Sequence, residues 1–508
     1  MRGALILDIL LTSRNFLQSI ADFFTSLPYA AIFTFVILLI NFLLAIGMIF
    51  WERKSAQSVW AWLLILFFLP IIGFILYVLF GRTIYNKEIF KVTEKDKIGL
   101  EALVTEQLED IKMDKLTLPT PQAKKHRKLV HMLLNNNQSF LTSNNKVETF
   151  YETTEFFDQM LRDIENAQDH IHFQFYIFKL DSLGQKFYDA LVKKQKEGVD
   201  VKILYDDIGS RSLKLKNFKE LRDYGGKVEA FFPSRLALIN PRMNNRNHRK
   251  NVIIDGKIGY TGGTNVGEEY IGLSKKFGYW RDTHIRVQGN AVKSLQLRFM
   301  LDWNSHATRD NLSHHPRYFP EIPVIGDTAM QIAASGPDED WQQIKYGYIK
   351  MINSAKKSIY IQSPYFIPDS SMMEAIKIAL LSGIEVNIMI PPFPDHPFVY
   401  WGTYHNVGEL AMIGANVYIY ERGFLHQKVM IIDDEVVSIG SCNMDNRSYA
   451  LNFEVNAFIF DEKEAIQNRL QFEKDALYSK ILSPEVYNSR SKWIKFKEGI
   501  ANLIAPIL

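Results

Sequence analysis

The sequence predicts an α/β protein made of two copies of one α/β sandwich domain, preceded by a transmembrane hairpin of two helices. Three observations carry this prediction. A short pattern of His, Lys, Asp, Gly and Asn occurs twice with the same spacing, and a strand–helix–strand order recurs with it. Two long uncharged segments lie near the N-terminus. A chain of 508 residues leaves room for two or three domains.

We expect six segments along the chain. They are an apolar, interfacial segment at 1–26, the transmembrane hairpin at 27–81, a connector at 82–140, the first α/β domain at 141–325, the second at 326–485, and an amphipathic segment at 486–508. The net charge of +3 is too small to indicate a nucleic-acid partner, although it suits an anionic substrate. Cys442 is the single cysteine, so no intrachain disulfide is possible.

The segments from Pro28 to Phe50 and from Trp60 to Phe80 contain no charged residue. Each is long enough as a helix, at about 1.5 Å per residue, to cross a hydrocarbon core of about 30 Å. The segments outside the pair carry more Lys and Arg than the connection between them, which holds Arg53 and Lys54. The positive-inside rule therefore predicts a multi-pass membrane protein with both termini and the catalytic domains in the cytoplasm.

Apolar strands alternate with helices from residue 145 onward. In the first copy we expect a strand at 171–178, a helix at 183–196 ended by Gly198, and a strand at 199–205; the second copy repeats these at 359–363, 371–381 and 386–390. This alternation is typical of an α/β sandwich with a largely parallel or mixed sheet.

The repeated pattern contains the candidate catalytic residues. The first copy holds His248, Lys250, Asp255 and Asn265, and the second holds His426, Lys428, Asp433 and Asn443. In a strand, residues i and i+2 face the same side, so His248 and Lys250 project together. The turn at Asp255-Gly256 then brings Asn265 back beside His248. We expect the two copies to face each other and form one site with two histidines, two cations and two amides.

The acidic residues have separate roles in this interpretation. Asp255 and Asp433 complete the catalytic pattern, although their place at the turn favours a role in holding the turn backbone. Asp282 and Glu454 are the better candidates for orienting the histidines, because a carboxylate on one imidazole nitrogen fixes the tautomer. Cys442 is interpreted as a packing residue.

Other residue types give no further site. His172, His284 and His396 have no counterpart in the other copy and are interpreted as structural. No clustered Cys and His pattern is present, so the sequence predicts neither a metal nor a cofactor.

The paired patterns resemble those of the phospholipase D superfamily over residues 140–485. The N-terminal segment, with Arg53, Trp60, Pro70 and Gly81, and the runs Arg246 to Lys250 and Trp280 to His284 are similar to those of bacterial cardiolipin synthases. The resemblance implies a bacterial membrane enzyme that joins two phosphatidylglycerol molecules into cardiolipin and releases glycerol. It also implies that phosphatidylglycerol and cardiolipin are the partners of the chain in an anionic membrane.

The mechanism that the resemblance implies assigns each residue of the pattern. His248 is the expected nucleophile and His426 the expected acid and base, by analogy with the family. Lys250, Lys428, Asn265 and Asn443 are expected to bind the phosphoryl oxygens. Three alternatives stay open: a membrane-bound phosphodiesterase that hydrolyses lipid, a tethered nuclease, and a non-catalytic scaffold.

The C-terminal stretch from Ser491 to Leu508 mixes lysines with aromatic and aliphatic residues. This pattern fits a helix on an anionic membrane surface, and it fits equally a helix packed on the protein.

Overall fold

The computed structural model describes residues 29–50, 56–81, 104–113, 115–116, 118–233, 245–307, 310–393 and 397–504. The chain divides into two compact units, an apolar unit within Met1–Thr83 and a larger unit within Ile84–Pro506. The predicted interfacial segment at 1–26 lies outside the described residues.

The apolar unit consists of α2 (Tyr29–Phe50), α3 (Ala56–Phe68), α4 (Pro70–Leu76) and the short π-helix η1 (Tyr77–Gly81). Within the described residues, one helical stretch, Ala31–Phe50, is long and apolar enough to cross a membrane. Large apolar side chains of the unit are exposed, among them Phe42 at 62% and Phe67 at 76%. The first predicted span is therefore present as a single helix.

The second predicted span is helical but is divided into two helices, so the predicted hairpin is present in part. The chain breaks at Leu69, where φ is −128°, and restarts with Pro70 at the first position of α4. Proline has no amide hydrogen, so the carbonyl of Leu66 loses its helical partner. The side chain of Asn41 in α2 donates to the carbonyls of Leu66 (3.4 Å) and Pro70 (2.9 Å). A polar residue of the first helix thus satisfies the backbone at the break in the second.

The first half of the larger unit carries a mixed sheet in the order β4-β3-β2-β6-β7-β8-β1. Its strands are β1 (Thr142–Glu152), β2 (His170–Phe175), β3 (Asp200–Asp206), β4 (Lys227–Phe231), β6 (Asn251–Ile254), β7 (Ile258–Gly262) and β8 (Tyr279–Gln288). Its helices are α8 (Thr153–Glu165), α9 (Ser182–Lys196), α10 (Lys219–Asp223) and α11 (Val292–Asn304), and its short 3₁₀ turns are η2 (Leu215–Phe218), η3 (Glu268–Ile271) and η4 (Pro316–Tyr318).

The second half repeats this sheet strand for strand, in the order β13-β12-β10-β15-β16-β18-β9. Its strands are β9 (Thr328–Ser335), β10 (Ser358–Gln362), β12 (Glu385–Ile390), β13 (Asn416–Tyr420), β15 (Val429–Ile432), β16 (Val436–Gly440) and β18 (Asn452–Phe460), with β19 (Ser479–Ile481) added beside β13. Its helices are α12 (Gln343–Ile352), α13 (Ser370–Leu381), α14 (Pro397–Met412) and α16 (Glu462–Ala476). The predicted duplication is confirmed.

The predicted elements agree with the structure to within a few residues. The helix expected at 183–196 is α9, and Gly198 follows it with a φ of +94°, a conformation that glycine adopts without strain. The strand expected at 171–178 stops at Phe175, because Tyr176 and Ile177 leave the sheet and line the cavity described below.

The predicted connector contributes to the protein core. Its described part contains α6 (Pro121–Lys125) and α7 (Arg127–Asn137). Leu129, Val130 and Leu133 of α7 are fully buried in the hydrophobic cluster of the second half. Residues 118–137 are therefore an integral part of that half, although their charged and polar composition had suggested a linker.

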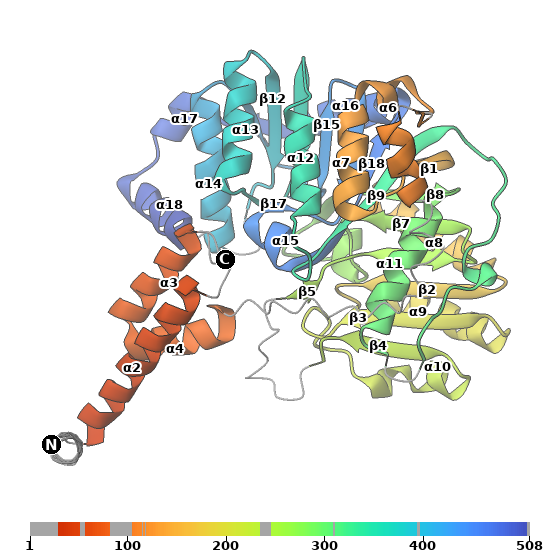
Figure 1. Cartoon of the computed structure of the whole chain (residues 1–508), viewed down its shortest axis with the longest axis horizontal. Helices are drawn as coiled ribbons and strands as arrows, with labels where there is room; N and C mark the ends of the chain where they lie inside the picture. The colour runs from red at the N-terminus through yellow and green to blue at the C-terminus, as the bar shows by residue number, and fades with distance from the viewer. Residues whose placement is uncertain are drawn as a thin grey trace, which may run out of the picture. The chain divides into compact units, whose positions relative to one another are not determined.

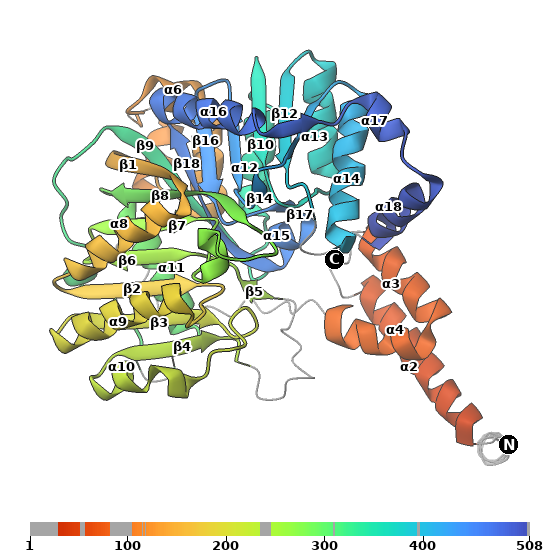
Figure 2. The ribbon, with the colours of Figure 1, turned by 180° about the vertical axis from the view of Figure 1, so that it is seen from behind.

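A shared hydrophobic cluster joins the two halves. It combines Ile253 and Ile285 from the first sheet with Ile431 and Ile439 from the second. Figures 1 and 2 show the first half in yellow and green against the second half in cyan and blue. Strand β1 also bridges the sheets, since Val147 pairs with β8 and Thr142 with β9. The two copies form one compact unit with a common interior.

The C-terminal segment forms α17 (Pro484–Asn488) and α18 (Lys492–Ile504), and α18 packs on α14. Ala501 is fully buried, and Glu498, which is 1% exposed, pairs with Arg490 at 3.0 Å. Trp493 and Phe496 stack on each other and are 62% and 58% exposed. The helix therefore packs on the protein with one face and presents aromatic side chains on another.

We expect this aromatic face to bind an anionic membrane surface. In residues 84–508 expressed alone, replacing Trp493 and Phe496 with alanine should weaken binding to phosphatidylglycerol vesicles at least about tenfold, because two aromatic rings no longer leave water. Cosedimentation with the vesicles measures this. Trp341→Ala, which removes another exposed tryptophan, is the control. If the unmodified protein, the double variant and Trp341→Ala bind the vesicles equally, α18 packs on the protein and does not bind the membrane surface.

Candidate active site

Each copy of the repeated pattern forms a tight hairpin, as predicted. The first hairpin joins β6 to β7, and φ is +54° at Asp255 and +64° at Gly256. The second joins β15 to β16, and φ is +54° at Asp433 and +59° at Asp434. Positive φ at both central residues is the requirement of a type I′ turn, which matches the twist of paired strands.

Asp255 and Asp433 lie at these turns and do not line the cavity. The carboxylate of Asp255 accepts hydrogen bonds from the backbone N–H groups of residues 168–170, at 2.7 to 3.2 Å. Asp433 accepts those of residues 356–358 in the same way. Each carboxylate thus fixes its hairpin to the start of the neighbouring strand, and not to its own turn as expected, and a catalytic role for either residue stays a prediction.

Two short strands exchange partners between the halves. Strand β5 (Arg246–Asn247) precedes His248 and pairs in parallel with β18 of the second half. Strand β14 (Gly423–Leu425) precedes His426 and pairs in parallel with β8 of the first half. The pairing continues into the histidines, whose N–H groups donate to Phe453 (2.9 Å) and Arg281 (2.8 Å).

This exchange gives each histidine a carboxylate from the opposite half. His248 Nδ1 lies 3.0 Å from Glu454 Oε2, and His426 Nδ1 lies 2.7 Å from Asp282 Oδ2. Both carboxylates are fully buried. Because each Nδ1–H donates to a carboxylate, Nε2 keeps the lone pair that attacks phosphorus or accepts a proton. The structure brings Asp282 and Glu454 to the histidines, as the sequence predicted, but in a crossed arrangement.

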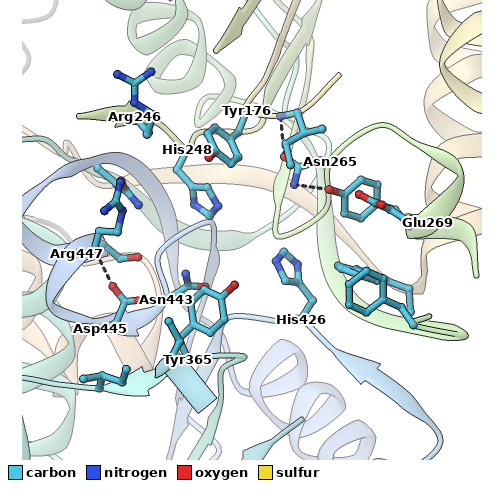
Figure 3. A pocket seen from close by; sticks show the side chains of 18 of the residues that line it. Tyr176, Arg246, His248, Asn265, Glu269, Tyr365, His426, Asn443, Asp445 and Arg447 are labelled. Carbon is cyan, nitrogen blue, oxygen red and sulfur yellow. Dashed lines mark hydrogen bonds between the residues drawn. The ribbon is translucent and has the colours of Figure 1, made fainter. Parts of the chain in front are cut away.

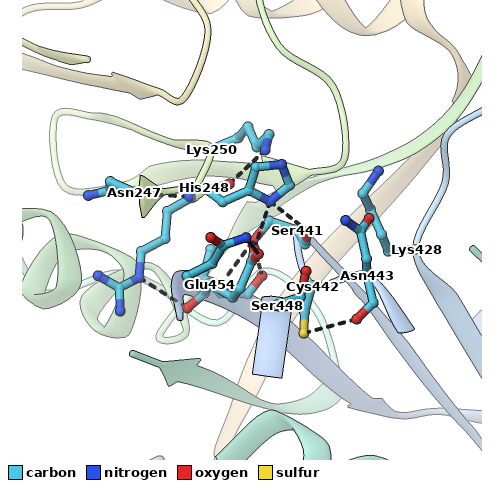
Figure 4. A network of polar contacts seen from close by, with 12 residues as sticks. Asn247, His248, Lys250, Lys428, Ser441, Cys442, Asn443, Ser448 and Glu454 are labelled. Carbon is cyan, nitrogen blue, oxygen red and sulfur yellow. Dashed lines mark hydrogen bonds and ion pairs between the residues drawn. The ribbon is translucent and has the colours of Figure 1, made fainter. Parts of the chain in front are cut away.

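Glu454 is itself held from two directions (Figure 4). Ser441 Oγ donates to its Oε2, and Asn452 Nδ2 donates to its Oε1 at 3.2 Å. Burial alone raises the pKa of Glu454, but His248 and Lys250 outweigh it and the pKa is lowered. Burial lowers the pKa of His248, and Glu454 opposes this change. Burial thus favours the neutral imidazole of His248 in the resting site, and the Glu454 carboxylate stabilises the imidazole when it becomes charged.

The two lysines of the pattern are buried, and the charge of Lys428 acts on Lys250. Lys250 Nζ donates to the carbonyl of His248 at 2.6 Å, and Lys428 Nζ donates to that of His426. Burial lowers the pKa of Lys250 to about 7; Glu454 opposes this change and Lys428 adds to it. An anion bound between the histidines would relieve the repulsion between these charges, so the site is suited to a phosphate.

A cavity of about 630 Å³ opens between the halves, and both histidines and both asparagines line it (Figure 3). Asn265 accepts a hydrogen bond from the N–H of Ile177 at 3.1 Å, which fixes its side chain. Asn443 Oδ1 is buried and has no hydrogen-bond partner among the described residues. Lys250 and Lys428, which are predicted to bind the phosphoryl oxygens, are not part of this lining.

Several residues of the site were not predicted. The ring of Tyr176 lies 5.0 Å from that of His248, and the ring of Trp280 lies 5.0 Å from that of His426. Ser441, which orients Glu454, stands inside the second pattern, where the first copy has Gly263. That difference between the copies was the available signal for Ser441. Tyr176 and Trp280 lie outside the repeated pattern, so the repeat gave no signal for them.

His172, His284 and Cys442, which are interpreted as structural or packing residues, are not part of the cavity lining. His172 stacks on Phe299 with ring centroids 4.4 Å apart, and His284 stacks on Phe156 at 4.2 Å. Cys442 is buried, and burial raises the pKa of its thiol. His396 lies outside the described residues. Within the described ranges, no group of three His, Cys, Asp or Glu side chains is placed to hold a metal ion.

A duplicated mixed sheet with two histidines facing one cavity defines the class of two-half phospholipase D-like enzymes. The chain matches the family described as "Cardiolipin synthase, PLD-like domain" at residues 160–277 and 348–476, and a phospholipase D-nuclease N-terminal family at residues 30–82. It belongs to the cardiolipin synthase family of phosphatidyltransferases.

Relatives match nearly the whole chain. Cardiolipin synthase 2 of Staphylococcus epidermidis is 56% identical over 92% of this chain and 96% of its own length. The major cardiolipin synthase of Bacillus subtilis is 52% identical over 92% of this chain and 98% of its own. Among solved structures, phosphatidylserine synthase of Haemophilus influenzae covers 75% of this chain and 100% of its own, with a TM-score of 0.57 and 17% identity. That last likeness concerns the fold alone.

Proposed function

We propose that the chain transfers a phosphatidyl group from one phosphatidylglycerol to a hydroxyl of another, giving cardiolipin and glycerol through a phosphohistidine. The crossed histidine–carboxylate pairs at one cavity carry this proposal. They supply one imidazole to attack phosphorus and another to move a proton. Membership of the cardiolipin synthase family supports the choice of lipid.

In the first step, Nε2 of His248 attacks the phosphorus of the donor. The bond from phosphorus to the head-group glycerol oxygen breaks. His426, which enters this step as the imidazolium after taking a proton from water on Nε2, gives that proton to the glycerol oxygen, so glycerol leaves. Asn265 and Asn443 hold the phosphoryl oxygens, and the charges of Lys250 and Lys428 stabilise the added negative charge.

In the second step, a head-group hydroxyl of another phosphatidylglycerol attacks the phosphohistidine. His426, now neutral, takes the hydroxyl proton, the phosphorus–nitrogen bond breaks, and His248 is regenerated. The bonds broken and formed over the whole reaction are both phosphodiester bonds, so the free-energy change is small and the reaction is reversible.

The apolar unit is assigned the role of membrane anchor. We infer that α2 and the broken second segment both cross the bilayer of a bacterial cell, with the larger unit in the cytoplasm, as the flanking cations favour. Anchoring holds the site where phosphatidylglycerol is concentrated, which raises the effective concentration of the lipid acceptor over that of other nucleophiles.

Glycerol is the reagent that tests this function. Excess glycerol should suppress cardiolipin formation from phosphatidylglycerol and should convert added cardiolipin back to phosphatidylglycerol, because glycerol resolves the same intermediate. Mass spectrometry of the lipids measures both effects, with the His426→Ala variant as the inactive control. If phosphatidic acid is the main product at neutral pH and glycerol has no effect, the chain is a phospholipase and not a transferase.

A further inference from the structure

Two arginines line the cavity on the side of His248. Figure 3 shows Arg246 and Arg447 on one side of the histidine pair and Glu269 on the other. Burial raises the pKa of Tyr176 to about 12; the Asp206 carboxylate adds to this rise, and both arginine charges oppose it. Arg246 is 2% exposed, which places its charge inside the protein. Two guanidinium groups therefore line this side of the cavity.

The side of His426 has a different character. The ring of Trp280 lies 5.0 Å from that of His426, and Phe277 packs on Trp280 at 5.4 Å. Glu269 lines this side as well and pairs with Lys179 at 2.8 Å. Lys276 also lines this side, with its Nζ 4.6 Å from the centroid of the Phe277 ring, so this wall carries charges of both signs. The guanidinium groups of the lining lie on the side of His248.

Carboxylates near the arginines are themselves held by the backbone. Asp206 lies 3.4 Å from Arg246 and also accepts the N–H groups of Ile208, Gly209 and Asn247, at 2.9 to 3.0 Å. Asp445 accepts the N–H of Ser448 at 2.6 Å, and burial raises its pKa to about 6. These two carboxylates offset the two guanidinium charges, so this wall offers an anion guanidinium N–H donors and not a net positive charge.

The proposed reaction requires a place for two phosphates at once. While the donor phosphate is bound between the histidines, the acceptor carries its own phosphate, joined to the attacking hydroxyl through a single glycerol unit. That second phosphate must lie in the same cavity. Guanidinium groups present a planar fork of N–H donors that matches phosphate oxygens.

We propose that Arg246 and Arg447 form a subsite for the phosphate of the acceptor lipid. The subsite rests on the proposed function and deepens it: a hydroxyl attached to a phosphodiester is held for attack, whereas free glycerol and water are not. The choice between transfer to lipid and transfer to small hydroxyl compounds is thus made by these two side chains.

The test measures how one intermediate is shared between two acceptors. The full-length chain is given phosphatidylglycerol vesicles with labelled glycerol, and the ratio of cardiolipin to labelled phosphatidylglycerol is recorded. Arg447→Gln should lower this ratio about tenfold, which corresponds to the loss of a charge-assisted hydrogen bond. Arg447→Lys and Arg246→Lys keep the charge but lose the fork, so they should lower it by a smaller factor.

Arg222→Gln, at an exposed position of α10, is the matched control and should leave the ratio at the wild-type value. Because the ratio compares two fates of the same phosphohistidine, slower formation of that intermediate does not change it. A wild-type ratio in all three cavity variants, with both products reduced in proportion, would overturn the subsite. A wild-type chain that makes no cardiolipin would instead overturn the proposed function, and the subsite with it.

Discussion

His248→Ala and His426→Ala are each expected to lower cardiolipin formation by about 10⁴-fold or more, because residues that act as a unit fail together. Both imidazoles belong to one cavity, and neither has a substitute among the residues that line it. Product formation in vesicles measures the loss. His315→Ala, at an exposed histidine outside the cavity, is the control and should keep wild-type activity. Substantial activity in either cavity variant would contradict a site made from two halves.

The role of each histidine can be separated with a donor whose leaving group needs no proton, such as phosphatidyl p-nitrophenol. With this lipid, His426→Ala should release nitrophenol and accumulate an acid-labile phosphate on His248, because only the general acid is missing. His248→Ala should release none. Nitrophenol release by His248→Ala, with the acid-labile phosphate on His426, would show that the two roles are exchanged.

Glu454→Gln and Asp282→Asn are expected to lower turnover by about 10²- to 10⁴-fold, since an amide holds the imidazole in the wrong tautomer and removes its counter-charge. The pH profile gives a second readout for Glu454. The carboxylate raises the pKa of His248 against burial, so its loss lowers that pKa further. His248 attacks as the neutral imidazole, and activity is lost as the pH falls through its pKa. The acid limb of the profile should therefore move to lower pH in Glu454→Gln.

The same donor tests the crossed arrangement. Asp282 supports His426, so Asp282→Asn should be largely rescued by the nitrophenol leaving group, whereas Glu454→Gln should not be. The opposite pattern of rescue would show that each carboxylate serves the other histidine. Thermal unfolding of both variants checks that the buried substitutions leave the fold intact.

Local features of the fold could be predicted because they follow from short sequence patterns. Alternating apolar residues gave the strands, Gly198 marked the end of α9, and Asp255-Gly256 gave the turn of the first hairpin. Asn41 and Pro70 were visible in the sequence, but hydropathy alone does not show that Pro70 divides the second segment and that Asn41 satisfies the carbonyls at the break.

The crossed pairing could not be predicted because it depends on strands too short to have a pattern. β5 has two residues and β14 has three, and each pairs with a strand of the other half. Their register alone decides which carboxylate meets which histidine. Arg246 escaped prediction for a related reason: it lies in β5 and reaches the cavity through that exchange.

The exchange of β5 and β14 also determines when during synthesis the enzyme can become active. His248 leaves the ribosome 206 residues before Glu454, the carboxylate that orients it. A nascent chain with only its first half folded thus has an imidazole without its counter-charge and Asp282 without a histidine. Both histidine–carboxylate pairs are completed only when the second half has folded against the first.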